Sequence, residues 1–150
     1  MRSYLEALQK PGQQVNPLFT TLGVQLEHVA DGEAVLVLPS NPGLVQGGGV
    51  VAGGVLATLA DEAMAHAVIG GLEQGQITAT VECSVRFLAP ARPATKLTAR
   101  AVVVRRGGTI VFVEADVSDE NGRLLARASG SFLVMARRTV AVAAAVPDSP

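Results

Sequence analysis

The most informative part of this 150-residue sequence is GGGVVAGGVLATLADEAM, residues 47–64. Five glycines within eight residues, 47–54, lead directly into an alanine-rich apolar run that carries one isolated acid, Asp61. Across residues 53–70 the apolar side chains recur at the spacing of one helix face, which predicts a single long α-helix. The residues on that face are Leu56, Leu59, Ala60, Ala63, Ala67 and Ile69.

The segments that flank this helix alternate apolar and polar residues, which is typical of β-strands. Before the helix, residues 24–39 alternate around Asp31 and Gly32, a pair that favours a two-residue hairpin turn. After the helix, four further stretches show the same alternation and are separated by Pro or Gly residues. These predicted strands are 77–90, 96–106, 109–119 and 123–135.

One amphipathic helix cannot cover both faces of such a sheet. We therefore predict an α+β fold, in which a curved antiparallel sheet wraps around the long helix and another subunit covers the outer face. Residues 16–136 would form this domain. Residues 1–15 would be an N-terminal helical segment, and residues 137–150 a tail that we expect to be flexible.

The N-terminal region favours two short helices. The first covers residues 2–10 and ends before Pro11. The second runs from Pro17 to Leu22, because Asn16 followed by Pro17 is a favourable cap and first turn.

The composition argues against several classes of protein. The net charge is −1 and there is no basic run, so neither nucleic acid nor an anionic membrane is an expected partner. Cys83 is the only cysteine, which suits the reducing cytoplasm. Beside it there are only His28 and His66, at no metal-ligand spacing, so we expect no metal and no cofactor. We identify neither a signal peptide nor an apolar run of about 18 residues that would span a membrane.

The glycines before the helix admit two interpretations. Residues 47–52 satisfy the G-x-G-x-x-A spacing of dinucleotide-binding loops, but no strand precedes them and the later strands are expected to be antiparallel. The alternative is a helix N-terminus whose free N–H groups stabilise an anion or an oxyanion. Gly53 and Gly54 lack a Cβ atom, which lets a carbonyl oxygen approach those N–H groups closely.

Asp61 follows Gly53 by roughly 12 Å along the helix axis. One chain cannot easily use both ends of that gap at one active centre. Two chains with antiparallel helices could place Gly53 of one opposite Asp61 of the other, so we predict an obligate dimer.

The surroundings of Asp61 favour a functional carboxylate. No Lys or Arg lies one helical turn away, so the carboxylate would be poorly solvated and a stronger base. The alternative is an ordinary solvated helix face that includes Glu62. We interpret Glu62 and His66 as a structural i,i+4 pair.

Two segments together resemble a known family. G-G-V-L-A-T-L-A-D, residues 53–61, is followed by T-V-E-C-S-V-R-F-L-A-P-A, residues 80–91. This pattern resembles the hotdog-fold acyl-CoA thioesterases of the phenylacetyl-CoA thioesterase type, and the likeness extends roughly over residues 16–135. The resemblance implies a sheet wrapped around a central helix, homodimers that share one continuous sheet, and often homotetramers made of two dimers. It also implies active sites that are built by both chains of a dimer.

The resemblance also implies roles for individual residues. Asp61 matches the catalytic carboxylate, and Gly53 matches the glycine whose N–H polarises the thioester carbonyl. Gln46 falls where the family has Asn or Gln near that carbonyl, and Thr80 falls where a Ser or Thr assists the attacking water. Asp61 and Thr80 would come from one subunit, Gly53 and Gln46 from its partner. The family's histidine before the two glycines is replaced here by Ala52.

We therefore expect a thioester hydrolase that cleaves an acyl-CoA to the free acid and CoA, with Asp61 as general base or nucleophile. Gly54 is a further candidate for substrate binding. Three arginines at strand ends, Arg92, Arg105 and Arg106, could meet the phosphates of CoA.

Two alternatives stay open. A non-catalytic acyl-CoA-binding hotdog protein is indicated by the lost histidine. A hotdog enoyl-CoA hydratase or dehydratase is suggested by Asp61 and His66, although their side chains would diverge by about 140° on a helix. Other nucleophiles are weaker, because we interpret Cys83 as a small core residue. We interpret His28 as a structural or exposed strand residue.

Overall fold

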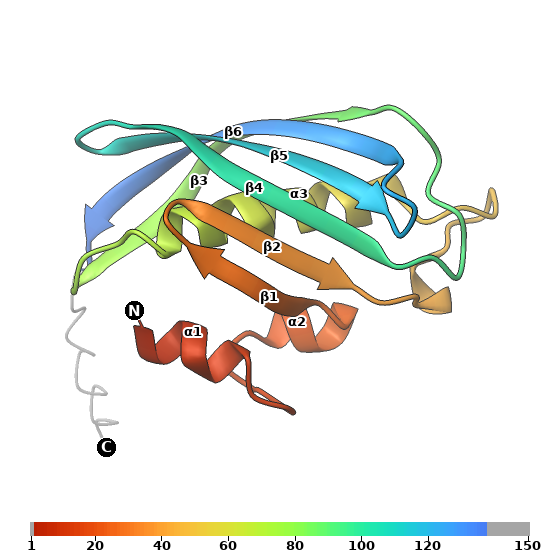
Figure 1. Ribbon diagram of the computed structural model, residues 1–150, viewed down its shortest axis with the longest axis horizontal. Helices are drawn as coiled ribbons and strands as arrows, with labels where there is room; N and C mark the ends of the chain where they lie inside the picture. Colours follow the sequence, from red (N-terminus) through yellow and green to blue (C-terminus); the bar gives the residue numbers. More distant parts are fainter. Residues whose placement is uncertain (1, 138–150) are drawn as a thin grey trace, which may run out of the picture.

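The fold is a curved antiparallel sheet wrapped around one long helix (Figure 1). The structure, a computed structural model, describes residues 2–137. Two short helices at the N-terminus lie beside the first strands. The elements in chain order are α1 (Arg2–Leu8), α2 (Pro17–Leu22), β1 (Gln25–Ala30), β2 (Glu33–Leu38), the 3₁₀ turn η1 (Pro42–Leu44), α3 (Gly53–Ile69), β3 (Gln76–Phe87), β4 (Leu97–Arg106), β5 (Ile110–Asp119) and β6 (Leu124–Ala136).

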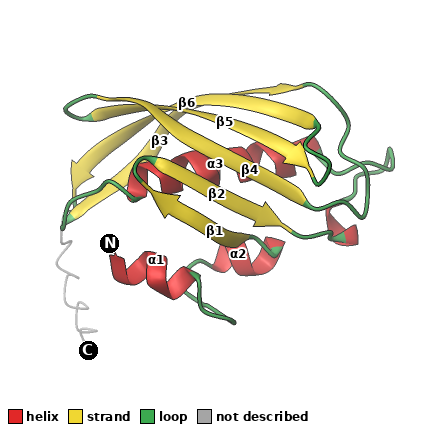
Figure 2. Ribbon diagram, in the orientation of Figure 1, coloured by secondary structure: helices red, strands yellow, loops and turns green. Residues whose placement is uncertain are grey.

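All six strands belong to one sheet with the order β1-β2-β4-β5-β6-β3. Each neighbouring pair is antiparallel, and α3 lies across the concave face, where it contacts every strand (Figure 2). The core between them consists mainly of Val, Leu and Ala side chains. The predicted α+β architecture and its helix and strands are therefore confirmed.

The local signals that predicted these elements act as expected. Asp31 and Gly32 both have positive φ, 52° and 80°, as the tight turn between β1 and β2 requires. The side chain of Asn16 accepts a hydrogen bond from the N–H of Phe19 and caps α2, and Pro17 occupies its first turn. Both predicted N-terminal helices are therefore present.

The buried face of α3 is wider than the predicted stripe. Ile69 is only half-buried, whereas Met64, His66 and Val68 are fully buried. The reason is that the curved sheet encloses the helix, so that side chains beyond one narrow stripe are also covered.

Two sequence expectations concern membranes and the tail. In residues 2–137, no helix has the length and apolar character needed to cross a membrane. Of the predicted C-terminal tail, residues 138–150 lie outside the described residues.

Candidate active site

Asp61 and Thr80 meet at the outer edge of the sheet. Asp61 lies in the middle of α3 and is half-buried, and Thr80 lies on the edge strand β3. The hydroxyl of Thr80 donates a hydrogen bond to Oδ1 of Asp61 at 3.0 Å. Within the described chain this is the only hydrogen bond to the carboxylate, so Oδ2 remains available to another molecule.

A β-bulge turns Thr80 toward the helix. Strict alternation would put Thr80 on the opposite face from Cys83 and Val85, both of which pack against the core. The pairing of β3 with β6 slips between Thr80 and Glu82, so that Val81 is an extra residue. The bulge therefore brings Thr80 to Asp61, a placement that period-two alternation does not predict.

Cys83 lies near the same carboxylate. Its thiol is half-buried, and burial, followed by the negative charges of Asp61 and Glu82, raises its pKa. The thiol is therefore protonated at neutral pH and is a poor nucleophile. This agrees with its interpretation as a small core residue.

His66 is part of a buried network and not of a surface ion pair. Its side chain is 1% exposed, and its Nδ1–H donates to the backbone oxygen of Glu62 at 2.7 Å. The hydroxyl of Tyr4 lies 3.3 Å from Nε2, and the side-chain amide of Asn16 donates to that hydroxyl. Burial lowers the pKa of His66 and raises the pKa of Glu62. The predicted i,i+4 contact is present, with Oε2 of Glu62 3.7 Å from Nδ1 of His66. Because burial favours the neutral imidazole, this contact is not an attraction between two charges.

Gln46 and Gly53 share a second site at the N-terminus of α3. Both line a cavity of about 320 Å³ together with the exposed apolar residues Phe87 and Leu88. The Oε1 atom of Gln46 accepts a hydrogen bond from the N–H of Gly48 at 2.7 Å. That bond fixes the amide and leaves its Nε2 donors free to point to a ligand.

The first N–H groups of α3 are uncapped. Ala52 is the N-cap residue, and it makes no side-chain hydrogen bond to the helix. Among residues 2–137, no acceptor faces the N–H of Gly53 or of Gly54. The positive end of the helix dipole is therefore free to stabilise a carbonyl oxygen or an oxyanion at this point.

The structure thus brings the predicted residues together as two pairs, Asp61 with Thr80 and Gly53 with Gln46. The pairs lie roughly 12 Å apart along α3, so one chain does not join them.

The three arginines do not form a cluster. Arg92 precedes β4, whereas Arg105 and Arg106 end it, and the ten residues of this strand span roughly 30 Å. The guanidinium of Arg106 donates to the carbonyl of Val68 near the end of α3.

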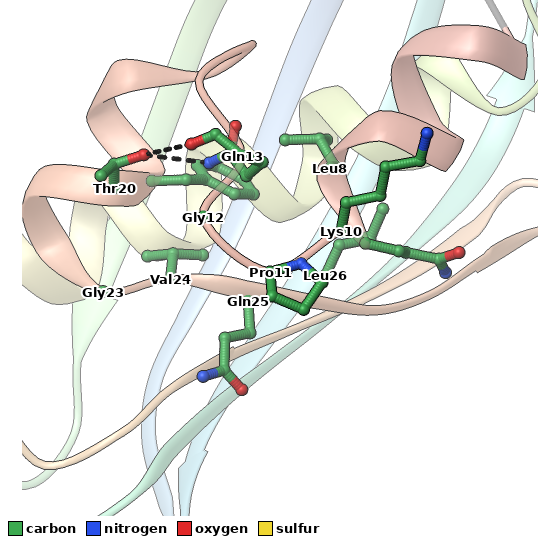
Figure 3. Close-up of a pocket in the computed structure, with 12 residues that line it drawn as sticks. Leu8, Lys10, Pro11, Gly12, Gln13, Thr20, Gly23, Val24, Gln25 and Leu26 are labelled. Carbon is green, nitrogen blue, oxygen red and sulfur yellow. Dashed lines mark hydrogen bonds between the residues drawn. The ribbon is translucent and has the colours of Figure 1, made fainter.

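A larger cavity lies elsewhere. It measures about 450 Å³ and lies between the loop that joins α1 to α2 and the strand β1 (Figure 3). Two hydrogen bonds between Gln13 and Thr20 hold that loop to α2. The cavity contains none of the predicted site residues.

Comparisons with known proteins agree on one family. Residues 48–126 match the thioesterase superfamily. A protein from Halobacterium salinarum with the provisional name of an esterase is 38% identical over 128 residues, which cover 78% of this chain and 83% of that protein.

Solved structures give the same result. A variant of the phenylacetic acid degradation protein PaaI from Thermus thermophilus is 28% identical, with a TM-score of 0.72 over 79% of this chain and 98% of that one. PaaI of E. coli, 24% identical, matches the fold with a TM-score of 0.76 over 81% of this chain and 86% of that one. Together with the antiparallel sheet around a central helix, these matches show that the chain has the hotdog fold and belongs to the thioesterase superfamily.

Proposed function

We propose that this protein is an acyl-CoA thioesterase in which Asp61 supplies the base or the nucleophile. The observation that carries the proposal is the hydrogen bond from Thr80 to Asp61, which holds a half-buried carboxylate with one oxygen free. The free Oδ2 either removes a proton from water or attacks the thioester carbon directly. Thr80 orients the carboxylate during either step.

The same reaction needs a stabiliser for the oxyanion. The uncapped N–H of Gly53 and the side-chain amide of Gln46 lie at one cavity and can both donate to a thioester oxygen. A single preorganised donor of this kind is worth about 10²–10³ in rate. This pair therefore completes the chemistry that Asp61 begins.

We further propose that the two pairs of residues meet across a homodimer. β3 is an edge strand of twelve residues that pairs only with β6 within the described chain. Long unprotected edges of this kind are ready to pair with another chain. Pairing of two β3 strands about a twofold axis would bring the N-terminus of one α3 toward Asp61 of the other. The outer sheet face, with the exposed Val104 and Phe112, could then join two dimers into a tetramer.

The alternatives are supported to different degrees. The buried and neutral His66 is already bonded to Glu62 and Tyr4, which disfavours the hydratase. Ala52 in place of a histidine favours a non-catalytic acyl-CoA binder. Restoring the imidazole by Ala52→His would raise the rate strongly if the remaining site is intact.

The test is hydrolysis of aryl, short-chain and long-chain acyl-CoAs, with detection of the free thiol, by the wild type and by Asp61→Asn. We expect the variant to lose about 10²–10⁴ in kcat on every substrate that the wild type cleaves. Glu62→Gln is the matched control, because it removes the adjacent carboxylate and should retain activity. Near-wild-type turnover by Asp61→Asn would remove Asp61 from the mechanism. Binding of acyl-CoA without turnover by the wild type would favour the non-catalytic alternative.

A further inference from the structure

A third cavity is linked through the chain to the one at the N-terminus of α3, because Ala91 lines that cavity and the next residue, Arg92, lines this one. It measures about 280 Å³ and is lined by the loop before β4 and the turn between β5 and β6, including Arg92, Asp119, Glu120 and Arg123. The sequence analysis singled out Arg92 but gave no reason to pair it with Arg123.

Backbone hydrogen bonds fix the segment 87–92, whose residues line one cavity or the other. The N–H of Val51, just before α3, donates to the carbonyl of Ala91. The N–H groups of Leu88 and Ala89 donate to the carbonyl of Leu125. The segment 87–92 therefore lies between the loop that carries Gln46 and the strand that follows Arg123. Its first part lines the Gly53 cavity, and its last residue lines the Arg92 cavity.

Some of the charged groups in the Arg92 cavity are already bonded within the protein, and others are not. The carboxylate of Asp119 accepts the N–H groups of Asn121 and Arg123 and is engaged in holding the turn. Glu120 accepts the N–H of Lys96. Among the described residues, the guanidinium groups of Arg92 and Arg123 have no hydrogen-bond or ion-pair partner. Two free guanidinium groups can each bind a phosphate with paired N–H donors.

We propose that Arg92 and Arg123 bind the nucleotide phosphates of CoA, an inference that rests on the proposed thioesterase function. The pantetheine arm then follows the apolar segment 87–91, and the thioester reaches the N–H of Gly53. The phosphates and the carbonyl oxygen are thus held by the same protomer. Arg105 and Arg106 are excluded from this phosphate site, because they lie at the far end of β4.

The experiment compares two substrates with the same acyl group, one on CoA and one on N-acetylcysteamine, which has no phosphate. For Arg92→Gln and for Arg123→Gln we expect KM for the acyl-CoA to rise roughly tenfold or more. We expect kcat to stay unchanged, as should both constants for the phosphate-free substrate. Retained turnover of the phosphate-free thioester also shows that the variants fold. Arg105→Gln is the matched control, because Arg105 is an exposed arginine at the far end of β4 that lines neither cavity.

The outcomes separate this inference from the proposed function. If the wild type cleaves both substrates and the two variants keep its KM for acyl-CoA, the phosphate site is overturned and the thioesterase stands. Equal losses on both substrates also overturn a phosphate-specific role. If the wild type cleaves neither substrate, the proposed function fails. Calorimetric titration with free CoA then tests the phosphate site. The proposal predicts that both variants bind CoA more weakly than the wild type, and unchanged binding would contradict it.

Discussion

Thr80 determines which oxygen of Asp61 is free to contact another molecule. Its hydroxyl occupies Oδ1, and the neighbouring Cys83 thiol stays protonated because burial and the adjacent acids raise its pKa. A carboxylate held by one hydrogen bond has a defined orientation. The hydroxyl is therefore expected to act through the position of Asp61 as well as through the attacking water.

Replacing Thr80 tests this positioning role. Thr80→Val keeps the shape of the side chain but removes the donor. We expect kcat to fall by about 10- to 100-fold, since a hydrogen bond to a charged group is worth about 1.5–3 kcal/mol. Thr80→Ser keeps the hydroxyl and should retain most of the activity. The measurement is kcat and KM on one acyl-CoA. Equal kcat values for the Val and Ser variants would show that the hydroxyl does not matter.

At the scale of residues, the sequence predicts which side chains form the candidate site but not how all of them are oriented. Asp61 and Gly53 are recognisable because an isolated acid and a glycine pair stand at defined places on one helix. The orientation of Thr80 is not predictable, because an unmarked bulge at Val81 changes the parity of the strand. The partnership of Arg92 with Arg123 is also hidden, since it depends on the approach of two loops that are far apart in sequence.

At the scale of elements, a chain of hydrogen bonds ties the N-terminal helices to α3. It runs from Asn16 to Tyr4, to His66 and to the carbonyl of Glu62. The ring of Phe19 in α2 lies 5.0 Å from the ring of His66. The imidazole must be neutral to accept the Tyr4 hydroxyl at Nε2.

This network predicts how stability depends on pH. Burial lowers the pKa of His66 in the folded state, so below the unfolded value of about 6.5 the unfolded chain binds more protons and stability falls. One pH unit below that value the loss reaches up to about 1.4 kcal/mol. Glu62, with a raised pKa, has the opposite sign, because its contribution is lost as pH rises above about 4.5.

The measurement is urea unfolding at pH 7.5, 6.5 and 5.5, at one protein concentration, for the wild type and for His66→Phe. Phe fills the same aromatic stack without a titratable group, and Glu62 is present in both proteins. The stability difference between them should shrink as pH falls below 6.5. A difference that is constant over this range would contradict the prediction.

Gly130 maintains the contact of β6 with the bulged part of β3. A Cβ atom at Gly130 would lie 2.9 Å from the backbone oxygen of Glu82 and 3.3 Å from Cε of Met64. A backbone oxygen cannot move aside cheaply, so Gly130→Ala should destabilise the protein by about 1–3 kcal/mol. Ser129→Ala, on the exposed face of the same strand, should change stability by less than about 0.5 kcal/mol. Equal midpoints of thermal unfolding for the two variants would contradict this packing.

The elements themselves are largely predictable, since their signals are local. The Asp31-Gly32 turn, the Asn16 cap and the period change after α3 each mark a boundary by backbone chemistry. The burial of His66 is not predictable in this way, because a helix enclosed by a curved sheet buries positions outside its apolar stripe. That Tyr4 is the hydrogen-bond partner of His66 depends on how α1 packs against α3, and no local sequence pattern predicts that packing.

At the scale of the whole molecule, the proposed site is divided between two ends of one helix. The carboxylate half and the N–H half lie roughly 12 Å apart on one rigid helix. In the proposed homodimer a second copy brings complementary halves together, and the twofold axis creates two identical sites. The sequence suggests this arrangement by helix geometry alone, but the relative position of two chains is not encoded in any single segment.

The backbone around Gly53 allows its N–H to be removed selectively. Gly53 is the first residue of α3, where proline is well tolerated. Ala52 has φ −60° and ψ 136°, an extended conformation that is compatible with a following proline. Gly53→Pro therefore deletes one hydrogen-bond donor and keeps the helix. Gly53→Ala is its control, since its Cβ meets the Phe87 ring at an ordinary distance of 3.4 Å.

The most direct test of the shared site is complementation between two inactive variants. Asp61→Asn and Gly53→Pro are each expressed and purified alone, and in a third sample the two variants are co-expressed in equal amounts. Hydrolysis of one acyl-CoA is then measured for all three samples. In a mixed dimer one site regains both an intact Asp61 and an intact Gly53, so the mixture should recover roughly a quarter of the wild-type activity. A mixture no more active than the two separate variants, with mixed dimers demonstrated, would contradict a site built by two chains.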